Sequence, residues 1–134
     1  MKSIGPCLAT LLVPALAVPA MTWAQTVTPQ FKHDLPNVPG KALIAVTVDY
    51  PPGTKSAPHS HAKSGFIYAY VVSGAIRSQV DDEPAKIYRA GESFFEMPGA
   101  HHKISENAST TEPARLLAVF VVDPNDTLTT PDPR

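Results

Sequence analysis

Four of the five histidines lie in two short clusters, and these residues have the side chains best suited to chemistry. His59 and His61 are separated by one residue, and the pair His101-His102 follows about forty residues later. On an extended segment, side chains two residues apart share a face and lie ~6.6–6.8 Å apart. Two imidazoles can converge from that spacing on one ion, with bonds of ~2.0–2.1 Å. The first pair therefore indicates a metal site, although such pairs also occur by chance on ordinary surfaces.

The second cluster can give only one ligand to the same ion. His101 and His102 are adjacent, and neighbouring residues of a strand point to opposite faces of the sheet. This argument alone does not choose between them. Cys7 is the only cysteine, so a site built from several thiolates is excluded. An imidazole site with open positions suits one divalent ion of Fe, Mn, Ni, Zn or Cu, and the spacing does not select one of these metals.

Short β-strands must position these histidines. Runs rich in β-branched and aromatic residues are separated by turn signals, and no ten-residue window has helical spacing. Fifteen prolines also oppose a helical bundle. The expected strands cover residues 42–50, 66–72, 75–80, 86–89, 93–97 and 115–122. The pattern predicts one all-β domain, either a sandwich or a closed barrel.

Residues 1–24 have the features of a secretory signal peptide. Lys2 gives a positive start, an apolar run follows, and small residues precede a cleavage site after Ala24. A membrane anchor is the alternative, but the apolar run contains Pro14 and Pro19 and is shorter than the ~20 residues that span a bilayer. We therefore expect a periplasmic or secreted protein with no stable membrane span after cleavage. A mature chain without cysteine suits such an oxidising compartment.

The rest of the chain divides into three parts. An extended, proline-containing arm (25–40) precedes the barrel (41–122), and a Pro-rich tail (123–134) follows it. The formal net charge is −1, with 11 Lys+Arg against 12 Asp+Glu. No basic excess is present to neutralise a phosphate backbone, so a nucleic-acid partner is not expected.

The first histidine cluster lies in a segment that resembles the first conserved motif of the cupin superfamily. Gly53 is followed by five residues and then by His59 and His61. The strand at 66–73 and then Gly74 complete the similarity.

The second cluster lies in a segment that resembles the second cupin motif. Residues 91–102 read as a glycine, a strand, the turn Pro98-Gly99, two further residues and a histidine. That register selects His102 over His101 as the ligand. Asn107 stands one residue later than the asparagine of the family motif. The resemblance covers most of the predicted barrel.

The resemblance implies a single-domain double-stranded β-helix, or jelly-roll barrel, that holds a divalent metal inside its mouth through His59, His61 and His102. Family sites usually add a glutamate three or four residues after the second histidine. Here Gly65 and Phe66 occupy those positions. The expected ligand set is therefore three neutral imidazoles, with water or substrate at the open positions.

Glu96 is the candidate for a replacement carboxylate, either as a direct ligand or as a residue behind the ligands. It lies on the strand before His102, and it faces the same side as His102 only if the intervening Pro98-Gly99 turn leaves the register unchanged. Otherwise it is a solvated strand residue. Aromatic residues that line the barrel would suit a flat acid, or would simply fill the core. Polar strand residues would anchor a substrate carboxylate, or would simply face solvent. The candidate substrate contacts are Tyr68, Tyr70, Arg77, Gln79 and Phe94.

The function implied by the resemblance is that of an exported metal-dependent enzyme that acts on a small organic or aromatic acid. Oxygenase and decarboxylase-type lyase are the two reaction classes considered. The alternative is a non-catalytic periplasmic module that binds a small ligand or a metal ion. The sequence identifies no catalytic residue apart from the candidate metal ligands.

A homodimer is expected from the composition of the last strand. Residues 116–122 include no polar side chain, whereas a strand with one wet face should alternate. The barrel interior can cover one face, so a second subunit is expected on the other. In the monomeric alternative, the arm at 25–40 folds back over that outer face.

Overall fold

The structure is a computed structural model that describes residues 24–134. The expected signal peptide and Cys7 lie outside the described residues, apart from Ala24 at the expected cleavage site. Among the residues described, no helix is long and apolar enough to cross a membrane.

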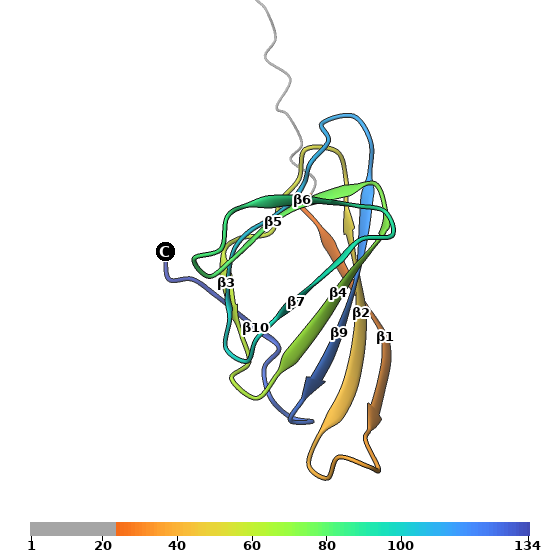
Figure 1. The fold of residues 1–134 in the computed structure, drawn as a ribbon, viewed down its shortest axis with the longest axis vertical. Helices are drawn as coiled ribbons and strands as arrows, with labels where there is room; N and C mark the ends of the chain where they lie inside the picture. Colours follow the sequence, from red (N-terminus) through yellow and green to blue (C-terminus); the bar gives the residue numbers. More distant parts are fainter. Residues whose placement is uncertain (1–23) are drawn as a thin grey trace, which may run out of the picture.

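Two antiparallel five-stranded sheets face each other and enclose the core (Figure 1). The first sheet has the order β1 (Thr26–Asp34), β2 (Ala42–Tyr50), β9 (Ala114–Val122), β4 (Phe66–Ser73), β7 (Ser93–Glu96). The second has the order β10 (Thr129–Pro131), β3 (His59–His61), β8 (His101–Asn107), β5 (Ala75–Val80), β6 (Lys86–Arg89). The fold is the all-β jelly-roll barrel predicted from the sequence.

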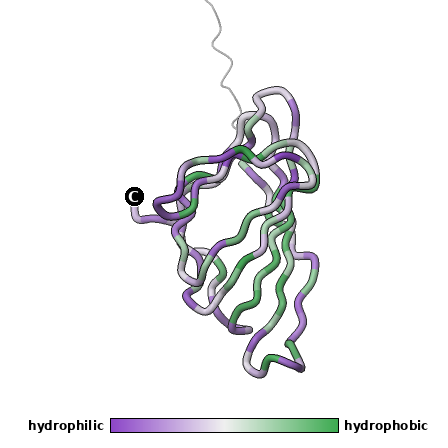
Figure 2. Tube along the Cα trace, viewed as in Figure 1, coloured by the Kyte–Doolittle hydropathy of each residue, from purple (hydrophilic) through white to green (hydrophobic). Residues whose placement is uncertain are grey.

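The core lies between the sheets because the long strands alternate their side chains. β2, β4 and β9 bury every second residue, and the residues between these are partly or largely exposed. Their hydrophobic character is plain in Figure 2, where β2, β4 and β9 are mostly green. Ile67, Val71 and Val122 are among the most completely buried side chains. Burying one such aliphatic side chain stabilises the fold by about 1.5–3 kcal/mol.

Gly74 makes the tight turn between β4 and β5. Its φ is +71°, a left-handed conformation that L side chains rarely adopt. A Cβ atom at this position would also collide with the carbonyl oxygen of Pro113 and with Ala114. The glycine of the first motif is therefore required by both backbone conformation and space.

The extended arm forms a strand of the first sheet. β1 pairs with β2, and the register shifts between Pro29 and Phe31. Proline is tolerated here because β1 is an edge strand, where a missing N–H breaks no internal ladder. The arm thus lies beside β2 and does not cover the outer face of β9.

The Pro-rich tail also contributes a strand. β10 pairs with β3, with Thr129 opposite His61 and Pro131 opposite His59. The tail is further tied to the barrel by Asp132, whose backbone N–H donates to the carbonyl of Pro58 (3.0 Å). The segment that the sequence placed outside the barrel therefore borders the histidines.

Candidate metal centre

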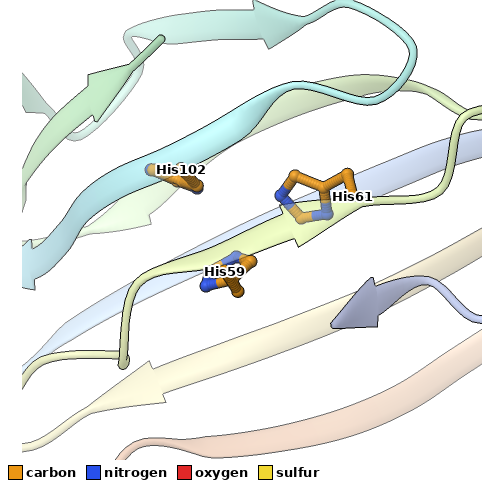
Figure 3. A group of neighbouring side chains, drawn as sticks. All are labelled: His59, His61 and His102. Atoms are coloured by element: carbon orange, nitrogen blue, oxygen red, sulfur yellow. The ribbon is translucent and has the colours of Figure 1, made fainter. Parts of the chain in front are cut away.

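Two neighbouring strands bring the three candidate ligands together. His59 on β3 is opposite His102 on β8, and His61 lies two residues further along β3. One ring nitrogen from each of the three histidines lies within 4.8 Å of the others. Figure 3 shows the three imidazoles gathered between the strands. His61 and His102 are 8% and 3% exposed, so the centre lies inside the barrel.

Two carbonyl groups fix the orientation of the imidazoles on β3. Nδ1 of His59 is 2.8 Å from the carbonyl oxygen of Ala57, and Nδ1 of His61 is 3.1 Å from that of Leu128. A carbonyl oxygen only accepts, so each Nδ1 carries the hydrogen and each Nε2 has a free lone pair. Metal-binding histidines are held in this manner, with the second nitrogen donating to a carbonyl or carboxylate.

His102 is oriented by a hydroxyl group. Its Nε2 is 2.8 Å from Oγ of Ser78 on β5, and its Nδ1 faces a carboxylate oxygen of Glu96 at 3.3 Å. Both neighbours are buried. When Nε2 donates to the serine, Nδ1 has a free lone pair. This lone pair joins those on Nε2 of His59 and Nε2 of His61 as a third metal donor.

Glu96 supplies a buried carboxylate at the same place. It comes from β7, is 3% exposed, and its Oε2 lies 3.1 Å from Nε2 of His61. Despite that distance, neither atom has a hydrogen-bond partner among residues 24–134. A carboxylate lone pair and an imidazole lone pair at this separation repel unless a cation lies between them. Three imidazole donors and one carboxylate around a single point are a donor set that fits a divalent transition metal.

The charge state of the carboxylate agrees with this role. Burial raises the pKa of Glu96, but hydrogen bonds and charge from His102 and His61, when these imidazoles are protonated in the metal-free protein, outweigh burial and lower the pKa to about 2. Glu96 is therefore ionised at neutral pH. Burial also lowers the pKa of His59, which favours the neutral imidazole that a metal requires.

The carboxylate reaches the site from a different strand than in the usual motif. Gly65 and Phe66, where a glutamate was expected, give no carboxylate. Ile67 is the first inward-facing residue of β4, and it pairs directly with Glu96 across β4 and β7. The carboxylate therefore enters the barrel from β7, the neighbour of β4, level with the first inward-facing residue of β4.

His101 lies outside the centre. Its Nε2 is 2.8 Å from a carboxylate oxygen of Asp132 in the tail, and its backbone N–H donates to Asp81. The β5–β8 ladder skips Lys103, because Gln79 pairs with Ile104 and Val80 with His102. This bulge lets both His102 and Ser105 face inward, although they are three residues apart.

The centre opens into a cavity of about 220 Å³ between the two sheets. Its walls are mainly aliphatic side chains of β2, β4 and β9, and Phe120 closes one side. The tail contributes Leu128, Thr129 and Pro131, and the arm contributes Gln25 and Val27.

The candidate substrate contacts lie elsewhere. Tyr68 and Tyr70 are on the outer face of β4, where Tyr68 is 45% exposed. Arg77 pairs with Glu106 at 2.8 Å, and Gln79 donates to the carbonyl of Glu83. None of these four lines the cavity.

Phe94 is buried, but it packs edge-on against His102 with 6.0 Å between ring centroids, and it does not line the cavity either. The sequence interpretation did not include Tyr50, which does line it. The alternation of β2 could have found it, because Tyr50 shares its face with Val46 and Val48.

Comparison with known proteins agrees with this architecture. The family model for the cupin domain matches residues 46–120. A comparison with curated protein sequences gives no significant match. A conserved protein with a double-stranded β-helix domain from Klebsiella pneumoniae is similar in structure, with a TM-score of 0.64 and 19% identity. The alignment covers 83% of this chain and 86% of that one.

Two further solved structures are similar at lower TM-scores. An oxalate oxidase in complex with the substrate analogue glycolate has a TM-score of 0.59 and 23% identity, over 75% of this chain and 53% of that one. A predicted oxalate decarboxylase from Thermotoga maritima has a TM-score of 0.51 and 19% identity, over 72% and 93%. At these identities the similarity concerns the fold. Because the family model covers more than half of the chain and the jelly-roll barrel accompanies it, this chain belongs to the cupin family.

Proposed function

We propose that the protein is an exported enzyme that holds one divalent transition metal through His59, His61, His102 and Glu96 and acts on a small organic acid. The observation that carries the proposal is the buried pair of Nε2 of His61 and Oε2 of Glu96. The two atoms face each other at 3.1 Å, and neither has a hydrogen-bond partner in the part of the chain that the structure describes. A cation bound by both atoms, and shared with the other two imidazoles, would give each of the two unpaired atoms a partner.

The donor set favours an acidic ligand. Three neutral imidazoles and one carboxylate neutralise only half of the charge of a divalent ion. A bound ion would supply a Lewis acid with open positions for a substrate oxygen. The surrounding apolar walls, which include Val46, Leu116 and Phe120, exclude water and strengthen electrostatic attraction within the cavity.

The reaction class is an oxygenase or a decarboxylase-type lyase. Support comes from the fold neighbours, which include an oxalate oxidase and a predicted oxalate decarboxylase. These two classes give different products, so oxygen uptake and carbon dioxide release distinguish them in one substrate screen. Glycolate, oxalate and single-ring aromatic acids form the first panel.

Elemental analysis tests the metal centre. Protein purified from its native compartment should contain about one divalent metal per chain, and His102→Ala should lose it. The adjacent His101→Ala is the matched control and should keep it, because His101 faces Asp132 instead of the cluster. Equal metal content in the two variants would contradict the site. A full metal content without turnover of any acid would instead identify a non-catalytic binding module.

Export rests on the amino-terminal sequence. We propose cleavage after Ala24 and a periplasmic or secreted location. Amino-terminal sequencing of the mature protein should begin at Gln25. An intact terminus on protein found only in the cytoplasm would exclude this location.

A homodimer through the outer face of the first sheet completes the proposal. One apolar row crosses all five strands, because the pairs along it are Phe31–Ala45, Ala45–Val119, Val119–Tyr68 and Tyr68–Phe95. Three of these side chains are between 45% and 60% exposed. A flat row of this kind can pair with its own copy around a two-fold axis.

Light scattering tests the dimer. The wild-type mature protein should have twice the chain mass at micromolar concentration, and Val119→Glu should give a monomer that still binds metal. A wild-type monomer would remove the dimer and leave the metal centre unaffected.

A further inference from the structure

A second polar group lies on the cavity wall, separate from the metal ligands. It consists of the hydroxyl groups of Tyr50, Ser56 and Ser105, which we call the hydroxyl cluster. The phenol oxygen of Tyr50 is 3.0 Å from Oγ of Ser56 and 2.8 Å from Oγ of Ser105. All three residues line the cavity, and Tyr50 and Ser105 are 2% and 4% exposed.

The hydroxyl cluster has one hydrogen more than it uses. Three hydroxyl groups carry three hydrogens, and each can donate one bond. The two contacts within the cluster use two of them. In the part of the chain that the structure describes, these hydroxyl groups make no other hydrogen bond. One donor is therefore available to an oxygen in the cavity.

The cluster is held in a fixed position. The side-chain amide of Asn107 donates to the backbone carbonyl of Tyr50 at 3.1 Å, and the backbone N–H of Ser56 donates to the carbonyl of Ser105 at 2.8 Å. Burial raises the pKa of the Tyr50 phenol, so that the hydroxyl keeps its hydrogen at neutral pH.

This end of the cavity suits an uncharged group. No lysine or arginine within residues 24–134 lines the cavity. An anionic group placed at the hydroxyl cluster would be buried without a counter-charge, which is strongly unfavourable. An alcohol, phenol or carbonyl oxygen would accept the available hydrogen without that penalty.

The two polar regions are separated by the length of one small molecule. His102 and Ser105 both face inward from β8, and the bulge at Lys103 leaves them two ladder positions apart, or about 7 Å along the strand. A carboxylate at the metal centre and an uncharged oxygen at the hydroxyl cluster can therefore belong to one small molecule in the same cavity. The volume of about 220 Å³ also fits, since a cavity of ~150 Å³ holds benzene.

We infer that the hydroxyl cluster is the specificity site of the enzyme, and that the substrate is a single-ring-sized monoacid with an uncharged oxygen at the end opposite its carboxylate. This inference rests on the proposed function, because the metal centre must take the carboxylate. It separates this chain from enzymes whose substrate is a small dicarboxylate.

Ligand binding to zinc-loaded protein tests the inference without any turnover. The probes are benzoate, 4-hydroxybenzoate and terephthalate, measured by isothermal titration calorimetry. One net hydrogen bond contributes about 0.5–1.5 kcal/mol, so 4-hydroxybenzoate should bind about 2- to 10-fold more tightly than benzoate. Terephthalate should bind at least about 10-fold more weakly than benzoate, because its second carboxylate would be buried without a positively charged partner.

Variants show whether the cluster causes the preference. The triple variant Tyr50→Phe, Ser56→Ala, Ser105→Ala removes all three hydroxyl groups, so it should abolish the advantage of 4-hydroxybenzoate while the affinity for benzoate stays within about 2-fold. Tyr88→Phe is the matched control, because Tyr88 lies on β6 outside this cavity and should leave the preference intact. If the triple variant unfolds in a thermal melt, the comparison of terephthalate with benzoate on the wild-type protein still tests the inference, because it needs no variant.

The outcomes separate this inference from the proposed function. An unchanged preference in the triple variant, or terephthalate bound as tightly as 4-hydroxybenzoate, overturns the inference. The same holds if metal is bound and none of the three acids binds. Failure to bind metal at all instead overturns the proposed function.

Discussion

Glu96→Gln is the most informative single change, because it keeps the size of the side chain and removes only its charge. The carboxylate lies 3.1 Å from Nε2 of His61 and 3.3 Å from Nδ1 of His102, so an ion bound among these atoms would contact it directly. We expect the three histidines to remain in place, since Ala57, Leu128 and Ser78 orient them independently of Glu96.

The expected loss of metal affinity is at least about 100-fold. A single and a double charge ~3 Å apart attract each other by about 10 kcal/mol at an effective dielectric constant of ~20, and desolvation offsets most of this. Loss of a residue that merely orients a ligand already lowers metal affinity by about 10- to 100-fold. Loss of a charged ligand should exceed that range, which corresponds to about 2.8 kcal/mol or more.

Competition with a chromophoric chelator measures the zinc affinity of wild type and variant at pH 7.5. Glu83→Gln is the control, because Glu83 is exposed in the turn between β5 and β6 and should leave the affinity unchanged. Circular dichroism verifies that the variant is folded. A loss of less than about 3-fold in a folded Glu96→Gln protein would refute direct coordination, and a loss near 10-fold would reduce Glu96 to an orienting role.

Three further predictions concern the glycine turn, the tail and pH. Gly74→Ala should lower the free energy of unfolding by about 2 kcal/mol or more, because it combines a positive φ with a collision at Pro113, and urea denaturation measures this. Removal of residues 127–134 should lower metal affinity by about 10- to 100-fold while the barrel stays folded, because His61 loses its contact with the carbonyl of Leu128. As a control, removal of residues 133–134 alone should change neither the metal affinity nor the fold. An unaltered affinity in the longer truncation would contradict this role of the tail. In the metal-free protein the pKa of Glu96 is about 2, below the 4.5 of a free glutamate. Its ionisation therefore stabilises the fold above pH 4.5, and this contribution of about 3 kcal/mol is lost as the pH falls toward 2. Denaturant unfolding of the wild-type protein between these pH values should show this loss of unfolding free energy, and Glu96→Gln should show a smaller loss. If the unfolding free energy falls equally with pH in both proteins, the effect belongs to other groups.

The sequence identifies the strands whose side chains alternate and the residues that can bind a metal. All six expected strands agree to within one residue at each end with strands of the structure, namely β2, β4, β5, β6, β7 and β9. The local sequence predicts these strands, because β-branched and aromatic residues favour an extended backbone and turn residues end each run.

Two of the strands that the sequence did not predict, β1 and β10, depend on distant partners. β1 contains Pro29 and is exposed along its whole length, and β10 is three residues long. Neither has a hydrophobic pattern. Their backbone groups find partners on β2 and β3 only after the barrel has formed. Nothing in the local sequence therefore indicates that the tail contacts the metal centre.

The tertiary structure also determines which face of a strand points into the barrel. Phe66–Ser73 has apolar residues at both parities, so its sequence does not say whether Tyr68 or Ile67 faces inward. The two-residue period fixes only which residues share a face, and packing against the second sheet decides which face is inside. The types and spacing of His59, His61 and His102 therefore follow from the sequence. The position of Glu96 beside them, and of Tyr50 across the cavity, depends on strand pairing and on how the two sheets pack.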